Sequence, residues 1–133
     1  MSLKKIEYKD LNDKQKENYN FQKVSAILAD YGYITIRLHD DWKGADFVAL
    51  HINGSSLMVQ LKSRLTFDKK YLKKNLQICF RDNNNWYIYD HDKLLNEYSS
   101  SFESTDSWRK KGLYHKPQLS KSDIKYFEEF LLR

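Results

Sequence analysis

The chain has 133 residues, 41% of them apolar, which is enough to bury one core and too few to build two. Its net charge is +5, no apolar run approaches the roughly 20 residues that a membrane-spanning helix needs, and its first residues do not resemble a signal peptide. The single Cys79 excludes an internal disulfide and a cysteine-based zinc site, and its apolar neighbours predict that it is buried. We therefore expect one cytoplasmic domain, residues 1–133, without membrane contact.

A helix is the first element that the sequence predicts. Apolar side chains recur at spacings of three and four over residues 21–31, which predicts a helix over residues 13–31. Asn12 or Asp13 can cap the start of this helix, and Gly32 can end it.

Three strands are predicted to follow the helix. Residues 34–39 alternate apolar and polar side chains, as a half-buried strand does, and the polar residues 40–44 break that strand. Residues 47–52 are almost continuously apolar, which is typical of a central strand covered on both faces. Residues 57–62 form the partner strand after a turn at 53–56.

The middle of the chain predicts a short helix, a hairpin and another helix. Thr66 can cap a helix that runs to about residue 75. Residues 76–80 and 86–89 flank the turn-forming run 82–85, which predicts a β-hairpin. Asp90 can then cap a helix that ends at Tyr98.

The last part of the chain predicts a loop and a helix. Residues 99–107 are serine-rich and polar, which indicates a mobile loop. Residues 120–132 predict a final helix with a buried stripe. That stripe consists of Ile124, Phe127, Phe130 and Leu131.

Positive charge gathers in two segments. Residues 62–74 carry six basic side chains against one acid, and residues 108–116 carry four with no acid. Cations neutralise phosphates and neighbouring aromatic rings can stack on bases, so together the segments predict a nucleic-acid-binding surface. For either segment alone, a solvated lysine face is the simpler explanation. The residues that we assign to phosphate contacts are Arg64, Lys69, Lys70, Lys73, Lys74, Arg109, Lys110 and Lys111.

A carboxylate, an amide and a lysine stand at the ends of the second and third predicted strands. Alternation puts Gln60 and Lys62 on one face of the third strand. Asp46, at the start of the second strand, joins them opposite Lys62 if the hairpin loop has three residues. Two or four loop residues send its neighbours to the other face, unless a bulge at residues 44–45 re-aims the carboxylate.

These groups suit a metal-dependent phosphodiesterase. Mg²⁺ (or Mn²⁺) prefers oxygen ligands, so Asp46 is the expected anionic ligand and Gln60 a neutral one, while Lys62 orients water or offsets charge on the phosphate. Glu17, one turn before Phe21, can add a carboxylate if the helix packs on the sheet. Each residue alone also has an ordinary explanation as a turn, cap or solvated side chain. The four histidines share no metal-ligand spacing, so no zinc site is expected.

The segments Gly44-Ala45-Asp46-Phe47 and Val59-Gln60-Leu61-Lys62-Ser63-Arg64 resemble the PD-(D/E)XK nuclease superfamily, which has the restriction-endonuclease-like fold. The order of predicted elements over residues 12–90 also resembles the core of that family. The resemblance implies an α/β (α+β) fold with a three-layer core, in which helices flank a central mixed sheet. A C-terminal basic arm and helix, residues 108–133, would lie beyond that core.

The resemblance also implies roles for individual residues. Asp46 matches the metal-binding Asp of the family, and Lys62 matches its catalytic Lys. Gln60 stands where most members have Asp or Glu; some members with this replacement are active and others keep only the binding fold. Glu17 matches the acidic residue that many members carry on the first helix.

Three functions remain open at the level of the sequence. The first is a cytoplasmic, Mg²⁺-dependent DNA endonuclease of restriction or repair type, for which the resemblance also implies a homodimer that cuts two strands. The second is a catalytically inactive nucleic-acid-binding module of the same fold. The third is an interaction or structural protein whose basic surface serves only solubility.

Overall fold

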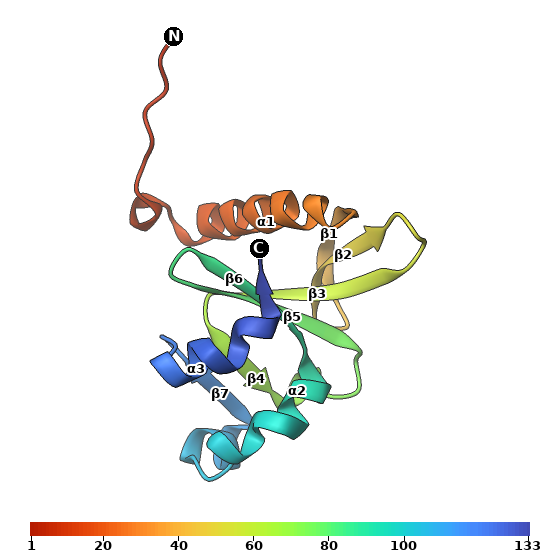
Figure 1. Cartoon of the computed structure of the whole chain (residues 1–133), viewed down its shortest axis with the longest axis vertical. Helices are drawn as coiled ribbons and strands as arrows, with labels where there is room; N and C mark the ends of the chain where they lie inside the picture. The colour runs from red at the N-terminus through yellow and green to blue at the C-terminus, as the bar shows by residue number, and fades with distance from the viewer.

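A six-stranded mixed sheet forms the centre of the protein, with helices on both faces (Figure 1). This computed structural model describes the backbone of residues 1–133 and the side chains of residues 1–39 and 43–133. β3 and β5 run parallel and all other neighbouring strands are antiparallel, so the expected α/β class with a mixed sheet is confirmed. The strands follow the order β1 Tyr33–Trp42, β2 Ala45–His51, β3 Ser56–Lys62, β5 Leu76–Asp82, β6 Asn85–Asp90 and β8 Leu131–Leu132.

The first helix, α1 Asp13–Asp30, agrees with its prediction and covers one face of the sheet (Figure 1). The Asn12 side chain accepts a hydrogen bond from the Gln15 amide at 2.8 Å, and Gln15 Oε1 accepts one from the Asn12 amide at 2.9 Å. Such reciprocal bonds satisfy amides that a helix start otherwise leaves unpaired. Gly32 has a φ of +88°, a conformation that ends helices at low cost for glycine.

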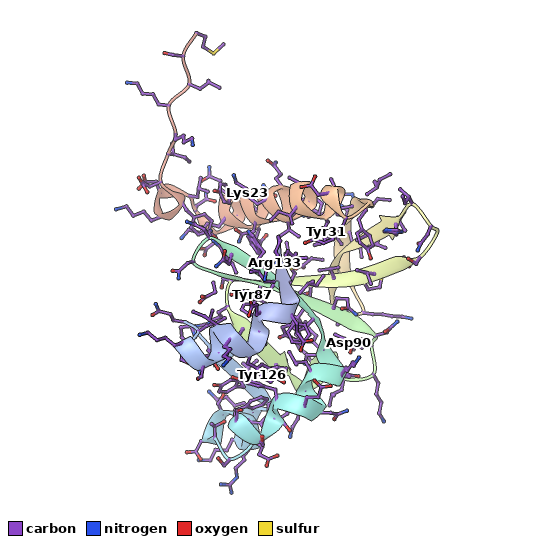
Figure 2. All side chains as sticks on the ribbon, viewed as in Figure 1. Lys23, Tyr31, Tyr87, Asp90, Tyr126 and Arg133 are labelled. Atoms are coloured by element: carbon purple, nitrogen blue, oxygen red, sulfur yellow. The ribbon has the colours of Figure 1, made fainter. Side chains whose placement is uncertain are left out.

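Tyr31 joins the end of α1 to the end of the chain. Its hydroxyl donates to the carbonyl of Arg133 at 3.0 Å and accepts from the Arg133 amide at 2.8 Å (Figure 2). Between α1 and the sheet, Val24 and Leu28 of the helix are buried with Phe47 and Cys79 of the strands. The prediction that Cys79 is a buried core residue is confirmed.

The predicted strands of the first half are present, with two differences. β1 continues to Trp42 because it pairs again with β2 at Trp42 and Ala45, so the turn begins only at Lys43. The expectation that the second strand is covered on both faces is wrong at its far end, where Leu50 is 40% exposed. Leu50 pairs with Ile34, itself 68% exposed, and the elements opposite α1 pack on β5 and β6 instead.

A second, two-stranded sheet lies on the face opposite α1. It pairs β4 Leu65–Asp68 with β7 Leu113–Lys116, and α2 His91–Tyr98 and α3 Lys121–Tyr126 pack beside it (Figure 1). Together they enclose an aromatic core. Its fully buried rings include Phe67, Phe80, Phe102 and Phe127.

The predicted helix at residues 66–75 is wrong. Thr66 lies in β4, where its hydroxyl donates to the Arg64 carbonyl at 2.9 Å, and only a short 3-10 helix, Lys69–Tyr71, follows. Asp68 is the capping residue, since it accepts from the Lys70 amide. The pairing partner β7 lies far along the sequence, so a local pattern cannot reveal the strand.

Residues 99–107 were predicted as a mobile polar loop, and this prediction is wrong in part. They contain a 3-10 helix, Ser99–Ser101, and the fully buried Phe102. The Phe102 ring stacks on Tyr114 with centroids 4.3 Å apart. One aromatic residue therefore fixes a segment that is otherwise serine-rich.

The final helix is shorter than predicted. Ser120 caps it, but α3 ends at Tyr126, a 3-10 helix follows at Phe127–Phe130, and the chain then enters β8. Pairing of Leu131 with Tyr87 requires an extended chain there. Ile124, placed in the buried stripe, is 46% exposed, whereas Phe127 is buried.

The predicted hairpin is confirmed as β5 and β6, and α2 begins at its predicted cap, Asp90, which accepts from the Lys93 amide. Residues 108–133 contribute β7 and β8 to the two sheets. Within the part of the chain that the structure describes, no helix is long and apolar enough to cross a membrane.

Candidate functional site

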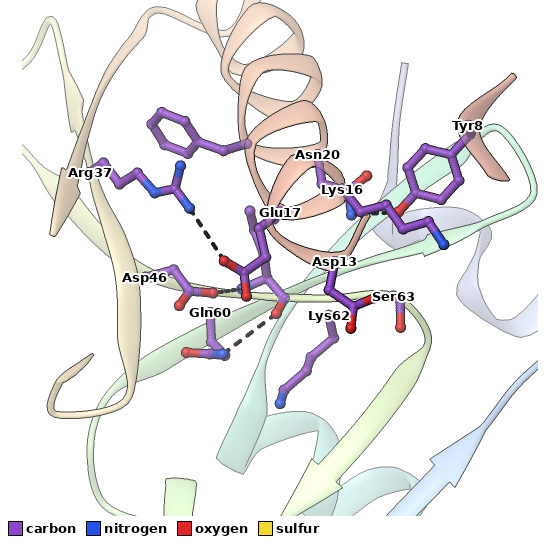
Figure 3. Close-up of a pocket in the computed structure, with 12 residues that line it drawn as sticks. Tyr8, Asp13, Lys16, Glu17, Asn20, Arg37, Asp46, Gln60, Lys62 and Ser63 are labelled. Atoms are coloured by element: carbon purple, nitrogen blue, oxygen red, sulfur yellow. Dashed lines mark hydrogen bonds and ion pairs between the residues drawn. The ribbon is translucent and has the colours of Figure 1, made fainter. Parts of the chain in front are cut away.

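A cavity of about 500 Å³ opens between the first turns of α1 and the adjoining ends of β2 and β3 (Figure 3). All four residues predicted for the metal site line it: Glu17, Asp46, Gln60 and Lys62. The other lining residues are Tyr8, Asp13, Lys16, Asn20, Phe21, Arg37, Leu61 and Ser63.

The hairpin register brings Asp46 to the face of Gln60 and Lys62. His51 and Ser55 are joined by a backbone hydrogen bond, so the loop has the three residues 52–54. Phe47 pairs with Val59, which makes Gln60 the cross-strand neighbour of Asp46. A loop at residues 53–55 would instead have made Lys62 that neighbour. Either three-residue loop places Asp46 opposite a residue on the face of Gln60 and Lys62, so the three side chains share a face.

Asp46 lies where β2 and β3 separate and joins the two strands through its side chain. Backbone pairing stops at Phe47 and Val59, and the Asp46 carboxylate accepts a bond from the Leu61 amide at 2.8 Å instead. The Gln60 side chain donates through Nε2 to the Leu61 carbonyl at 3.5 Å, which is a weak bond.

Glu17 reaches the cavity from α1 but shares its charge with two cations. Its carboxylate lies 3.4 Å from Lys14 Nζ and 3.9 Å from Arg37 Nη2, and its side chain is 63% exposed. Arg37 comes from β1, and its guanidinium lies 5.3 Å from the centroid of the Phe21 ring. Glu17 is therefore near the site as predicted, and binding a metal there would require it to exchange these partners.

Lys62 connects the cavity with the basic segments. Its Nζ lies 5.5 Å from the centroid of the Tyr71 ring, and Lys70 Nζ lies 5.2 Å from the same centroid. The Lys69 amide donates to the Gly112 carbonyl at 2.8 Å, and Lys69 Nζ lies 5.3 Å from the Trp108 ring. The two basic segments thus lie side by side, and the eight side chains assigned to phosphate contacts are all exposed.

The pKa of His115 is lowered by burial and by the positive charges at the end of β3. Burial and the charges of Arg64 and Lys62 lower its pKa below the usual value near 6.5, so the ring is neutral at pH 7. Its Nδ1 lies 3.0 Å from Thr66 Oγ1, whose own proton goes to the Arg64 carbonyl. Nδ1 therefore carries the proton of the neutral ring.

Several cavity residues were not predicted from the sequence. Asp13, Lys16 and Asn20 come from α1, where they continue the spacing of three and four that the apolar stripe sets with Val24 and Leu28. This polar continuation of a buried stripe is a signal that could have identified them. Tyr8 gave no such signal, because it precedes the helix and reaches the cavity only through folding.

The donor atoms suit a hard divalent cation with few protein ligands. Among the described side chains, no three of His, Cys, Asp or Glu converge on a common metal position. Asp46 and Gln60 nevertheless offer carboxylate and amide oxygens side by side, with Glu17 lining the same cavity. Mg²⁺ is commonly held by one or two carboxylates, with water and substrate phosphate as the other ligands, and this donor set fits that pattern.

Comparisons with protein-family models, with curated proteins and with solved structures each find no match. The case for a function therefore depends on the chemistry of the cavity and its surroundings.

Proposed function

We propose that the protein is a Mg²⁺-dependent (or Mn²⁺-dependent) DNA endonuclease that hydrolyses phosphodiester bonds. The observation that carries the proposal is the cavity shared by Asp46, Gln60, Lys62 and Glu17, in which Asp46 bonds to the backbone between Gln60 and Lys62. The resemblance of these segments to PD-(D/E)XK nucleases is consistent with it.

The residues of the cavity have separate roles in this proposal. Asp46 and Gln60 hold the cation, which when bound polarises the phosphate and lowers the pKa of a water. The Leu61 amide fixes the Asp46 carboxylate, so the ligand is oriented before the cation arrives. The Lys62 ammonium offsets the negative charge that builds on the phosphate oxygens during attack.

The basic surface holds the DNA backbone. The Tyr71 ring is shared by Lys62 and Lys70, and the Lys69 amide bonds to Gly112, which follows the segment Arg109–Lys111. A duplex bound to these cations therefore passes close to the cavity. Contacts of this kind bind phosphates without reading sequence, and their affinity falls as salt rises.

A nucleic-acid-binding module without catalysis is the second candidate. It is favoured by the neutral Gln60 at the position of a second acid, together with the absence of three converging metal-ligand side chains in the described part of the chain. In that case the same basic surface would bind DNA and the cavity would have no chemical role.

A plasmid-nicking assay with Mg²⁺ tests the proposal. Asp46→Asn removes the ligand charge and Lys62→Ala removes the ammonium, and we expect each to lower the cleavage rate by about 100-fold or more, with DNA retention unchanged. Asp30→Asn and Lys125→Ala are matched controls, because both residues are exposed and neither lines the cavity.

The outcomes separate the candidates. Cleavage that survives both Asp46→Asn and Lys62→Ala contradicts the proposed site. Retention of DNA without cleavage by the unaltered protein favours the binding module, and Gln60→Glu then asks whether one added carboxylate restores hydrolysis. A protein that neither binds nor cleaves DNA excludes both candidates.

A further inference from the structure

Two cations meet at one aromatic ring beside the cavity. Lys16 Nζ lies 5.5 Å and Arg81 Cζ 4.3 Å from the centroid of the Tyr8 ring. Neither cation forms an ion pair with a carboxylate among the side chains that the structure describes. Each is attracted to the ring, but the two positive charges repel one another, and an anion bound near them would offset that repulsion.

Hydrogen-bonding groups around Tyr8 are also incompletely used. Within the described chain, two buried side-chain atoms lack a partner, Asn20 Oδ1 and Arg81 Nη1, and both residues contact Tyr8. Asn20 Nδ2 donates to the Tyr8 hydroxyl at 3.0 Å, which leaves the phenol proton for another acceptor. If the Asn20 amide is flipped, the Tyr8 hydroxyl donates to Asn20 Oδ1 and Asn20 Nδ2 becomes the donor without a partner. Either arrangement therefore keeps one donor for a ligand.

The position of these groups connects them with the metal end of the cavity. Figure 3 shows Tyr8 and Lys16 on one side of the cavity and Arg37, Asp46 and Gln60 on the other. The cavity of about 500 Å³ thus has one end with Tyr8 and Lys16, here called the cationic end, and an oxygen-ligand end at which Asp46 and Gln60 lie beside Arg37. Asp13 also lines the cavity. A ligand that spans both ends needs negative charge at two points along its length.

The cationic end continues into a second depression. This cavity, of about 430 Å³, shares Tyr8 and Ser63 with the first and also includes Arg81, Asn83 and Gln118. Asp82 lines it too, but its carboxylate accepts from the Leu119 amide at 3.1 Å. An extended strand can therefore pass Tyr8 without ending there, which fits a chain of phosphates better than a small anion.

We infer that Tyr8 and Lys16 form a subsite for a second phosphate of the nucleic-acid strand whose neighbouring phosphate lies at Asp46 and Gln60. This rests on the proposed function. The Lys16 ammonium and the Tyr8 hydroxyl contact the phosphate oxygens. Arg81 is a positioning residue behind the ring, since Nε donates to the Asn83 carbonyl at 2.6 Å and Nη2 to Asn84 Oδ1 at 3.4 Å.

Binding of a short fluorescent single-stranded oligonucleotide in EDTA tests the subsite without cleavage. Lys16→Gln is expected to weaken binding about 3- to 10-fold and to reduce the slope of log affinity against log salt by about 0.7, the value for one phosphate contact on a single strand. Lys23→Gln is the matched control, because Lys23 lies on the same helix over the Tyr19 ring and does not line the cavity (Figure 2).

Tyr8→Phe separates the hydroxyl from the ring. It keeps the surface on which Lys16 and Arg81 rest and removes one hydrogen bond to a charged group, so we expect binding about tenfold weaker or more. The salt slope should be unchanged, because the hydroxyl carries no charge. Unchanged binding in both Tyr8→Phe and Lys16→Gln overturns the subsite, even if the plasmid is cleaved.

Two further comparisons define the ligand and separate the two proposals. Equal losses for oligonucleotides with and without a terminal phosphate support an internal phosphodiester, whereas a loss confined to the phosphorylated strand supports a terminal phosphate in the same subsite. If the protein never cleaves but Lys16→Gln still weakens binding selectively, the subsite stands and the nuclease proposal falls. If no strand binds, both fall.

Discussion

The two faces of the central sheet are packed in different ways. On the α1 face, the core is small, with Val24, Leu28 and Phe47 under the helix, and it gives way to the polar cavity. On the opposite face, aromatic rings fill the space between the two sheets, and Phe127 contacts both Phe80 and Tyr87. The comparison teaches that the candidate chemistry lies at the end of the sheet where apolar packing stops. Residues of α1 border it on one side, and Lys62 lies beside Tyr71 of the aromatic core on the other.

Phe127→Ala is the change expected to have the largest effect on stability. Its ring is fully buried, so its loss leaves a cavity and should lower the free energy of unfolding by about 3–5 kcal/mol. Urea denaturation measures this. Phe21→Ala is the counterpart on the α1 face, where the ring packs on Phe47 and is only partly buried, and a smaller loss is expected. Equal losses would show that the two faces are equally important for stability.

Asp123→Asn should have the next largest effect. Burial raises the pKa of Asp123, but bonds from Lys116, Ser120 and Tyr98 outweigh this and bring it to about 2, below its ordinary 3.8. The carboxylate therefore stabilises the fold at neutral pH, by about 2 kcal/mol from the size of the shift. That contribution is lost as the pH falls from about 4 towards 2.

The measurement is urea denaturation at pH 7 and at lower pH. The unaltered protein should lose its advantage over Asp123→Asn across the acid range. Asp106→Asn is the control, because this carboxylate is 79% exposed and pairs only with Lys110 among the described residues, so the change should be small at every pH. An advantage that stayed constant down to pH 2 would contradict the assigned pKa.

Ile34→Thr should have the smallest effect. Ile34 is 68% exposed on the part of the sheet that the aromatic side leaves uncovered, so the change should alter stability by less than about 0.5 kcal/mol. Val24→Thr is the buried counterpart under α1, where a hydroxyl without a partner should cost about 1–3 kcal/mol. Denaturation midpoints compare the two, and a large loss at Ile34 would contradict its exposure.

The sequence predicted the elements whose patterns are local. The helix α1, the hairpin of β5 and β6 and the Asp90 cap all depend on neighbouring residues, and all are confirmed. Of the two caps proposed for α1, Asn12 and Asp13, the structure has Asn12. β4 and β7 were missed because each is a strand only through the other. The last helix was extended too far because pairing of β8 with β6 overrides an apolar helical stripe.

The candidate site was predicted in part for the same reason. Alternation along one strand places Gln60 and Lys62 on the same face, but the loop length that brings Asp46 to that face could not be determined from the sequence. Tyr8 and Arg81 come from distant segments that meet only in the folded chain, and no spacing connects them. Polar residues at helical spacing before a buried stripe, such as Asp13 and Lys16, could have been recognised.

The sole thiol of the chain lies between α1 and the sheet. Cys79 on β5 is fully buried with Val24 and Val59, and burial raises the pKa of its thiol. The thiolate is the reactive form, so a thiol reagent can modify this side chain only after the helix has moved away from the strands. The rate of that modification would therefore measure how often the layer beside the cavity opens, with no introduced label.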